Sequence, residues 1–318
     1  MLLAESINYA AKILRAGELV AFPTETVYGL GADASQPEAL KKIFIAKQRP
    51  MDHPLIVHIS TVLQLSIWAR EIPPLAFQLA EAFWPGPLTL ILKKSLAVSD
   101  LITGHQDTIG LRIPAHPVAL ALLKNFGGGI AAPSANRFGR ISPTSAEAVR
   151  EELGEAVDLI LEGGDCEVGL ESTILDLSND VPVILRPGMI TAQQIAAVIK
   201  IPVLLAQKNA PRVSGSLESH YAPQTKMILM EREELISYVE KINFPVAVLV
   251  RKPLSTKNKS VQVILMPEDA KNYAHDLYRI LRELDHRSFN ELLVERVPLT
   301  SDWIAITDRL KRANFKVP

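Results

Sequence analysis

The chain has 318 residues, of which 48% are hydrophobic and 22% charged, and its formal net charge is -1 at pH 7. This length allows two domains with well-buried cores, and the near-neutral charge argues against a generally basic nucleic-acid binder. The single cysteine, Cys166, excludes an intramolecular disulfide and any multi-cysteine metal site, so we expect a reducing, cytoplasmic setting.

Strand and helix patterns alternate along the first two thirds of the chain, which predicts an α/β domain. Residues 1–19 have helical spacing and lack the continuous apolar segment of a signal peptide. Strands are predicted at the apolar runs ELVAFP, PLIVHI, PLTLIL, TIGLRI, GGIAAP, AVDLIL, STILDL and VPVILRP. Helices are predicted at 35–47, 74–83, 116–124, 144–153 and 191–199. No segment approaches the roughly 18 apolar residues of a membrane span.

Two helix starts are predicted from capping residues. Ser35 fits the first position of a capping box, with a glutamate three residues later. Ser142 precedes a proline and is expected to begin the helix at 144–153. The free N–H groups of that helix, with Arg137 and Arg140 beside them, would attract phosphate.

Periodicity lapses over 204–224, which indicates a linker between a domain at 1–203 and a smaller α/β domain at 225–318. In the second domain, strands are predicted at KMILM, FPVAVLV, VQVILM and ELLVERV, followed or separated by amphipathic helices. Ser301 is the expected N-cap of the last helix. Residues 1–203 hold 16 Lys and Arg against 21 Asp and Glu, whereas residues 225–318 hold 16 against 13.

Six loops next to predicted strands carry glycines, hydroxyls and cations: FPTETVYGLGADA, AKQRPMDHP, TIGLRIPAHP, APSANRFGRISPTS, GLESTILDL and ILRPG. Any one of them is typical of an ordinary polar loop, but together they indicate a ligand crevice at the sheet edge. Cations on loops of an acidic domain point to an anion site. The sequence has no phosphate-binding P-loop, no dinucleotide fingerprint, and no spacing that suggests structural zinc or a Ser-His-Asp triad.

Several of these residues have two interpretations. Lys47 and Arg49 follow a helical pattern and either solvate its C-terminal end or hold an anion. His58 lies in a buried-looking strand, where a core histidine is the commoner case. Cys166 has no neighbouring cation in the sequence and is expected to be a passive small residue.

Taken together, these motifs resemble the YrdC-like threonylcarbamoyl-AMP synthases, in the longer form with an additional C-terminal domain. The resemblance spans nearly the whole chain and rests on FPTETVYGLGADA, the K-x-R of Lys47 and Arg49, PLIVHI, WPGPLTLIL, GLRIPAHP, APSAN, ESTILDL, LRPG and SHYAP. It implies a twisted mixed sheet with helices around a concave basic cavity, plus a smaller Rossmann-like α/β domain. It also implies a nucleotidyltransferase that converts L-threonine, bicarbonate or CO2, and ATP into threonylcarbamoyl-adenylate and pyrophosphate.

The resemblance also implies site residues. Lys47 and Arg49 would be catalytic, stabilising the charge of the departing pyrophosphate. The residues implied in ATP binding are Arg49, His53, Thr108, Ser134, Asn136, Ser142, Arg186, His220 and Tyr221. Those implied around threonine are Thr26, His58, Arg112, Ala132 and Ser172. No protein metal site is expected, and Mg2+ is expected to accompany ATP, held by its phosphates.

Two features depart from the family pattern. His53 stands where the family commonly has asparagine, and the linker lacks the common S-P-G-M version. We expect the linker to fold over the cavity as a lid, with either His220 or Tyr221 at the nucleotide. The product would pass to a separate tRNA threonylcarbamoyl transferase, so contact of this chain with tRNA is expected to be weak, and none with membranes is expected.

Three rival functions stay open at this point. A YrdC-like fold could serve as an RNA-binding module, although aromatic and basic residues are not interleaved here. Related carbamoyl-adenylate chemistry occurs in hydrogenase-maturation proteins, but the single cysteine excludes their zinc finger. An inactive paralogue is the third alternative, and retention of both Lys47 and Arg49 argues against it.

Overall fold

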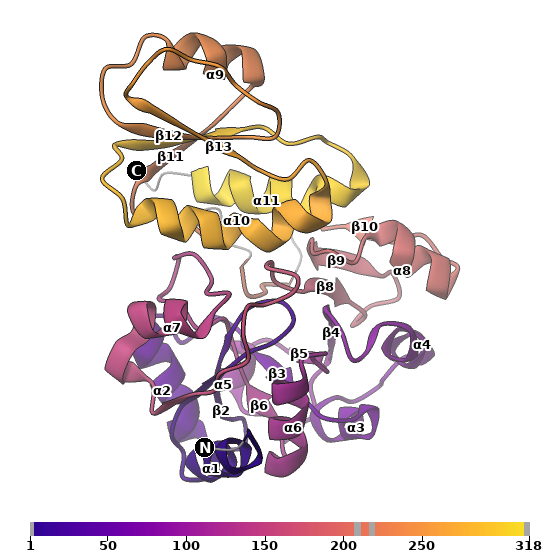
Figure 1. Cartoon of the computed structure of the whole chain (residues 1–318). Coiled ribbons are helices and arrows are strands. Elements are labelled where there is room, and N and C mark those ends of the chain that lie inside the picture. The colour runs from indigo at the N-terminus through magenta and orange to yellow at the C-terminus, as the bar shows by residue number, and fades with distance from the viewer. Residues whose placement is uncertain (1–2, 207–210, 216–219, 315–318) are drawn as a thin grey trace. The chain divides into compact units, whose positions relative to one another are not determined.

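The computed structural model describes residues 3–206, 211–215 and 220–314, and the chain divides into two compact units (Figure 1). Residues 1–138 and 142–216 form the N-terminal unit, and residues 139–141 and 217–318 form the C-terminal unit. The short segment 139–141 belongs to the second unit because its backbone pairs there. The Ala222 N–H donates to the Gly139 carbonyl oxygen at 3.0 Å, and Arg282 Nη2 donates to the Ile141 carbonyl oxygen at 2.8 Å.

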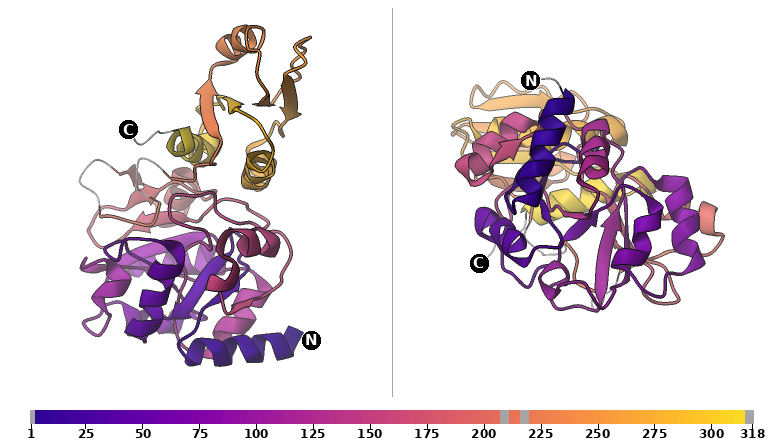
Figure 2. Two further views of the ribbon diagram at one scale, coloured as in Figure 1. Left: turned by 90° about the vertical axis from the view of Figure 1, so that its left-hand side faces the viewer. Right: turned by 90° about the horizontal axis from the view of Figure 1, so that it is seen from below.

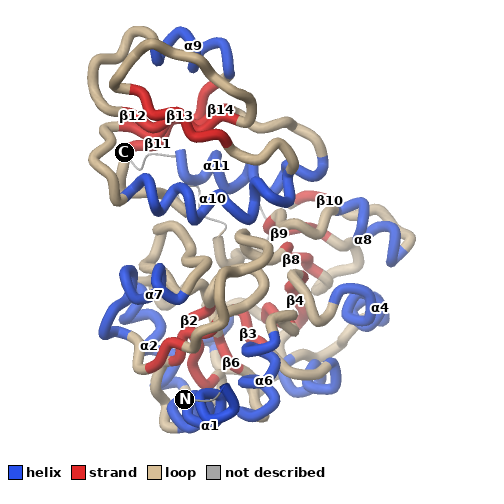
Figure 3. Tube along the Cα trace, in the orientation of Figure 1, coloured by secondary structure: helices blue, strands red, loops and turns tan. Residues whose placement is uncertain are grey.

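A ten-stranded sheet of parallel and antiparallel strands forms the N-terminal unit, with helices around it (Figure 3). Its strand order is β10-β9-β8-β4-β5-β3-β6-β2-β1-β7. The strands are β1 (Val20–Phe22), β2 (Gly29–Asp33), β3 (Ile56–His58), β4 (Leu88–Lys93), β5 (Thr108–Arg112), β6 (Ile130–Ala131), β7 (Leu159–Ile160), β8 (Thr173–Asp176), β9 (Val183–Arg186) and β10 (Leu204–Leu205). The predicted mixed α/β architecture is confirmed.

Eight of these strands coincide with predicted apolar runs, whereas β2 and β10 do not. The sequence pattern instead predicts that GLGAD, which forms β2, is part of the loop FPTETVYGLGADA. Packing explains the glycine: a Cβ on Gly31 would lie 2.8 Å from a ring carbon of Phe22 and 2.9 Å from a methyl of Ile130. Side chains of β1 and β6, the two neighbours of β2, therefore leave no room for a side chain at Gly31.

The central strands are buried on both faces, which explains their nearly continuous apolar sequences. Strands β3 and β5 run parallel, and their register pairs His58 with Arg112. Both residues are the last of their strands, so the two side chains are brought to the same edge of the sheet. This edge is where a ligand crevice is expected in an open α/β sheet.

Helices surround the sheet. Of those that the structure describes, the six that have eight residues or more lie close to predicted positions, whereas the four shorter ones are not predicted by the sequence. They are α1 (Leu3–Arg15), α2 (Pro37–Lys47), η1 (Val62–Gln64), α3 (Leu65–Trp68), α4 (Pro74–Phe83), α5 (Asp100–Thr103), α6 (Pro117–Phe126), α7 (Ala146–Leu153), η2 (Gly154–Ala156) and α8 (Ala192–Ile199). Helix α1 packs beside α6 (Figure 2), with Ile7 and Leu14 in one apolar cluster with Leu122. Among the described residues, no helix is both long and apolar enough to cross a membrane.

The two helix starts predicted from capping residues are wrong, the first by one residue and the second by three. Helix α2 begins at Pro37 with Gln36 as N-cap, and Ser35 instead donates its hydroxyl to Asp33 Oδ1 at 2.6 Å. The same Asp33 oxygen accepts from the Ser35 N–H at 2.8 Å, so this carboxylate at the end of β2 holds Ser35 in the turn before the helix.

Helix α7 begins at Ala146, and its N-cap is Ser145, whose hydroxyl accepts a hydrogen bond from the Ala148 N–H at 3.2 Å. Ser142 therefore does not begin this helix. It is fully buried and donates to Glu171 Oε1 at 2.6 Å. Arg137, expected beside the helix N-terminus, is exposed.

The C-terminal unit is a four-stranded parallel sheet in the order β11-β14-β12-β13. Its strands are β11 (Lys226–Met230), β12 (Val246–Val250), β13 (Val261–Leu265) and β14 (Glu291–Glu295). Helix α9 (Arg232–Val239) covers one face, and α10 (Ala270–Asp285) and α11 (Ile304–Asn314) cover the other (Figure 1). The predicted N-cap Ser301 is wrong, because Ser301 is the first residue of a short 3-10 turn, η3 (Ser301–Trp303), that precedes α11.

Candidate active site

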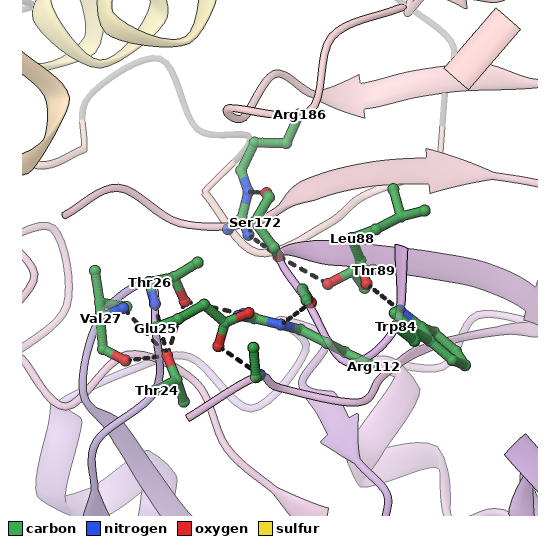
Figure 4. Close-up of polar contacts among 12 residues, drawn as sticks. Thr24, Glu25, Thr26, Val27, Trp84, Leu88, Thr89, Arg112, Ser172 and Arg186 are labelled. Carbon is green, nitrogen blue, oxygen red and sulfur yellow. Dashed lines mark hydrogen bonds and ion pairs between the residues drawn. The ribbon is translucent and has the colours of Figure 1, made fainter. Parts of the chain in front are cut away.

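A buried arginine organises one end of the site. Arg112 ends β5 and is 4% exposed. Its Nη2 atom forms an ion pair with Glu25 Oε1 at 2.6 Å, its Nη1 donates to Thr26 Oγ1 at 3.0 Å, and its Nε donates to the Gly86 carbonyl oxygen at 3.1 Å (Figure 4). Glu25 also accepts from the Ala115 N–H at 2.9 Å. The loop after β1 thus holds the guanidinium in one orientation.

His58 lies opposite Arg112 across the β3–β5 register and is 4% exposed. Burial, and then the positive charge of Arg112, lower the pKa of His58 to about 3, so the imidazole is neutral at physiological pH. Its Nδ1 atom is buried and finds no hydrogen-bond partner among residues 3–206, 211–215 and 220–314. A neutral imidazole with a buried, unsatisfied nitrogen is suited to hydrogen-bond a small polar ligand.

A second buried arginine lies at the end of β9. Arg186 donates from Nε and Nη2 to the Ser172 carbonyl oxygen at 3.1 and 3.0 Å, and from Nη2 to Ser172 Oγ at 3.1 Å (Figure 4). The Ser172 hydroxyl also pairs with Thr89 Oγ1 at 2.8 Å. Arg186 Nη1 donates to the carbonyl oxygen of Ser214, so this arginine connects the strand end to the linker.

Lys47 is the last residue of α2, and the interpretation of it as a solvated helix end is wrong. The side chain is 1% exposed, and its Nζ donates to the Ser134 carbonyl oxygen at 2.5 Å and to the Asn136 carbonyl oxygen. Burial, followed by the nearby Arg49, lowers the pKa of Lys47 well below its ordinary value. The αL conformation of Gln48 ends the helix and turns the chain at this point.

Arg49 is also buried, at 6% exposure, and donates from Nη2 to the Pro54 carbonyl oxygen at 2.9 Å. Its guanidinium carbon lies 5.6 Å from the ring centre of Phe138. The His53 ring contacts the same phenyl ring edge-on, with centroids 5.0 Å apart. Burial and the charge of Arg49 lower the pKa of His53. Phe138 therefore holds two of the predicted nucleotide-binding side chains together.

The segment 132–136 runs beside the start of β2. The Ala132 N–H donates to the Ile56 carbonyl oxygen at 2.9 Å, and Ser134 forms an isolated bridge with Gly29. Asn136 is 1% exposed and donates from Nδ2 to the Arg137 carbonyl oxygen at 2.7 Å. This segment supplies the carbonyl oxygens that bind Lys47, so its backbone is part of the site.

Part of the linker packs against the same unit. Val213 is 5% exposed and joins Ile91, Ile174 and Leu185 in an apolar cluster. Arg212 Nη1 pairs with Asp52 Oδ2 at 2.9 Å, and Gln106 Oε1 accepts from the Arg212 N–H at 2.8 Å.

The linker segment 212–214 and Thr108 line a small cavity of about 10 Å³. The predicted ATP-binding residue Thr108 is thus next to the linker, at the opposite end of β5 from Arg112. His220 and Tyr221 belong to the C-terminal unit. There Tyr221 stacks on Tyr278 at 5.9 Å and lies 4.9 Å from the guanidinium carbon of Arg309. Their predicted contact with the nucleotide stays a prediction.

Sequence reasoning missed the residues that support the predicted ones. Arg112 pairs with Glu25, and Ser142 bonds Glu171. Ser172 bonds Thr89, and the Arg49 guanidinium lies against Phe138. Glu25 and Glu171 are 6% and 5% exposed. The sequence does show Glu25 between two threonines and Glu171 at the start of ESTILDL, both within loops predicted to form the site. These two positions could have indicated that the carboxylates support the site.

The arrangement places four buried cations, Lys47, Arg49, Arg112 and Arg186, in one unit. Such a set can bind a polyanion and stabilise negative charge that develops during a reaction. Cys166 is buried, and burial raises the pKa of its thiol, which disfavours the reactive thiolate. Within the described residues, no group of three His, Cys, Asp or Glu side chains could hold a metal ion.

Two families match the chain. The Sua5/YciO/YrdC family, described as "Telomere recombination", matches residues 12–188, and the family described as "Threonylcarbamoyl-AMP synthase, C-terminal domain" matches residues 190–314. The threonylcarbamoyl-AMP synthase of Pyrococcus abyssi is 40% identical over 97% of this chain and 94% of its own length. That of Bacillus subtilis is 41% identical over 96% and 92%.

Solved structures agree with these matches. The crystal structure of Pyrococcus abyssi Sua5 complexed with L-threonine has a TM-score of 0.90 and 39% identity, covering 98% of this chain and 94% of that one. Escherichia coli YciO has a TM-score of 0.52 and 30% identity, covering 58% of this chain and 90% of its own.

Proposed function

The chain belongs to the Sua5/YrdC family of threonylcarbamoyl-AMP synthases, and from this premise we propose which of its residues bind each substrate. It is an enzyme that forms threonylcarbamoyl-AMP, and ATP is one of its substrates. The observation that carries our assignment is the buried pair of Arg112 and the neutral, unsatisfied imidazole of His58 at the ends of β5 and β3, in a unit that also buries Lys47, Arg49 and Arg186.

We place L-threonine at the edge formed by β3 and β5. Arg112 uses Nε and one N–H of Nη1 for Gly86 and Thr26, and its Nη2 group faces Glu25. A guanidinium has five N–H donors, so N–H groups remain for the substrate carboxylate. His58 Nδ1 is the partner for the threonine hydroxyl. Ser172 and the backbone at Ala132 complete the proposed pocket.

We place the triphosphate of ATP at Lys47, Arg49 and Arg186. The Lys47 ammonium has three donors, of which two bind the carbonyl oxygens of Ser134 and Asn136, and the third is directed to phosphate. Arg49 offers a planar guanidinium held against Phe138. His53, Thr108, Ser134, Asn136 and Ser142 are the remaining proposed nucleotide contacts in this unit. Because His53 is held neutral by burial and Arg49, it would donate a single N–H.

The chemistry then needs positioning and charge stabilisation, without a covalent enzyme intermediate. The neutral amine of threonine bonds to CO2, derived from bicarbonate, and loses a proton to give a carbamate. A carbamate oxygen attacks the α-phosphorus of ATP, and the bond to the pyrophosphate oxygen breaks in line. Lys47, Arg49 and Arg186 stabilise the charge that collects on the departing pyrophosphate. The carboxylates of Glu25 and Glu171 already bond Arg112 and Ser142, so Mg2+ would be bound by phosphates and water.

We further propose that the linker admits and then encloses the substrates. Val213 covers apolar side chains of the sheet, and the Ser214 carbonyl oxygen binds Arg186, so release of this segment would free a phosphate ligand. His220 or Tyr221 would approach the nucleotide in the same movement. A reactive mixed anhydride gains from exclusion of water. The product would be consumed by a separate tRNA threonylcarbamoyl transferase.

The decisive experiment is pyrophosphate release from ATP, with single omissions of L-threonine and bicarbonate. Release that requires both supports the proposal, whereas ATP cleavage independent of threonine would refute it. A matched pair of variants tests the subsite assignment. His58→Gln should raise the threonine KM while leaving the ATP KM unchanged, and Arg49→Ala should do the reverse. Equal effects of both variants on both substrates would contradict the assignment.

A further inference from the structure

The C-terminal unit has a cavity of its own. Strands β11, β12 and β14 run parallel, and they end at Met230, Val250 and Glu295. A cavity of about 450 Å³ is lined by the residues at and just after these three ends, together with one side of α11. The carboxyl edge of a parallel sheet is the usual ligand site of open α/β folds, and this volume suits a small metabolite.

Cations outnumber carboxylates in the lining. The four cationic residues of the lining are Arg232, Arg251, Arg296 and Lys311, and its three acidic residues are Glu231, Glu233 and Glu295. Two acids are already neutralised locally. Arg232 pairs with Glu295 at 3.3 Å, and Arg296 pairs with Glu231 at 3.1 Å.

Two buried side-chain donors of the lining have no acceptor among the described residues. Arg251 Nε and Thr307 Oγ1 are buried, and neither finds a hydrogen-bond partner within the part of the chain that the structure describes. The Arg251 guanidinium lies over the Trp303 ring, 5.3 Å from its centre, which fixes its position. Lys311 adds an ammonium from α11. Buried donors without partners are rare in folded proteins and indicate a missing acceptor.

Two further features define the acceptor. Helix α9 begins at Arg232 without a side-chain cap bond, so its first N–H groups are available at the cavity wall. Leu229, Val297 and Leu310 form an apolar part of the same lining. A ligand that fits therefore combines an anionic group with an apolar or ring-containing body.

We propose that this cavity binds a small organic phosphate, with Arg251, Thr307 and Lys311 as its phosphate ligands. Three separate donor groups, one just after β12 and two on α11, match the oxygens of a phosphate better than the two oxygens of a carboxylate. The site lies wholly within the C-terminal unit, so it is separate from the proposed ATP and threonine sites.

Trp303 provides the readout, because it contacts Arg251. The full-length protein is titrated with AMP and, separately, with ribose 5-phosphate, to distinguish nucleotides from sugar phosphates, while tryptophan fluorescence is recorded. The titrations use an Arg49→Ala background to weaken phosphate binding in the N-terminal unit. A Trp303→Phe variant identifies which part of the signal comes from this cavity.

We expect a saturable, Trp303-dependent response to at least one probe. Arg251→Met keeps the packing on Trp303 but removes the charge and should raise the Kd about tenfold. Lys252→Met is the matched control, because Lys252 is an exposed cation next in the chain that does not line the cavity, and it should leave the Kd unchanged. Lys311→Met gives a second test if Arg251→Met fails to fold by thermal melting. No Trp303-dependent response to either probe up to about 10 mM, or equal Kd values in the folded pocket variant and the control, would overturn the proposal.

Discussion

Replacement of Lys47 by methionine should damage both folding and catalysis, unlike an ordinary change at a helix end. The lysine is 1% exposed, and its ammonium binds two main-chain carbonyl oxygens, those of Ser134 and Asn136. Methionine preserves much of the volume but removes the donor that binds both carbonyl oxygens. Each lost bond costs about 1–3 kcal/mol, which gives a loss of about 2–6 kcal/mol in the free energy of unfolding.

The melting temperature reports the stability term. For a unit of this size, each kcal/mol shifts Tm by about 2–4 °C, so a decrease of about 4 °C or more is expected. The effect on the catalytic rate is separate from the effect on stability, because we assign the third N–H of Lys47 to phosphate binding. Loss of one such charge-stabilising group lowers the rate on the order of 100-fold. Pyrophosphate release is measured well below the Tm of the variant, so that unfolding does not contribute.

Lys42→Met is the matched control. Lys42 belongs to the same helix, its side chain is 41% exposed, and it pairs with Glu18 at the surface. Such a surface site should alter stability by only a few tenths of a kcal/mol and leave turnover unchanged. Near-normal Tm and turnover in Lys47→Met would refute the reasoning and return this residue to the helix-end interpretation.

Four further predictions concern the substrate pocket, the nucleotide site and the linker. With serine in place of threonine, kcat/KM should fall by about 10-fold. Valine should be a poorer substrate still, because it leaves His58 Nδ1 without a hydrogen bond. Equal turnover of valine and threonine would disprove the assignment of the threonine pocket. The pKa of His58 is about 3 in the folded protein, below its value of about 6.5 in the unfolded chain, so the unfolded chain binds more protons between these two pH values. The free energy of unfolding should therefore fall as pH drops below about 6.5, by about 2 kcal/mol at pH 5. Urea unfolding at pH 7 and pH 5 should show that this loss is absent from His58→Gln, and an identical loss in both proteins would contradict the assignment. Arg49→Lys should raise the ATP KM sharply, since an ammonium cannot replace a guanidinium fork; an unchanged KM would show that only the charge matters. A chain that ends after Ala206 keeps the β9–β10 pairing and should fold, as circular dichroism would show, but lose threonine-dependent pyrophosphate release; full activity would remove the linker from the mechanism.

The sequence by itself determined much of the architecture. Apolar runs predicted eight strands of the large sheet, and helical periodicity predicted α4, α6, α7 and α8 to within a few residues. These elements follow from local spacing, because each must bury one face or both against its neighbours. The motif set also identified the family, because those loops hold glycines, hydroxyls and cations in a combination that single motifs lack.

Only the tertiary structure decided the environment of each charged group. The same AKQRP sequence suits a solvated helix end or a buried site, and the difference arises from segment 132–136, nearly ninety residues away, whose carbonyl oxygens bind Lys47. Ser35 and Ser142 were assigned to helix starts because capping is judged from adjacent residues. Their hydroxyls bond Asp33 and Glu171 instead. Likewise, the β3–β5 register sets His58 beside Arg112, and burial there holds the imidazole neutral. Protonation and hydrogen-bond partners depend on groups brought together by folding, so local sequence patterns cannot specify them.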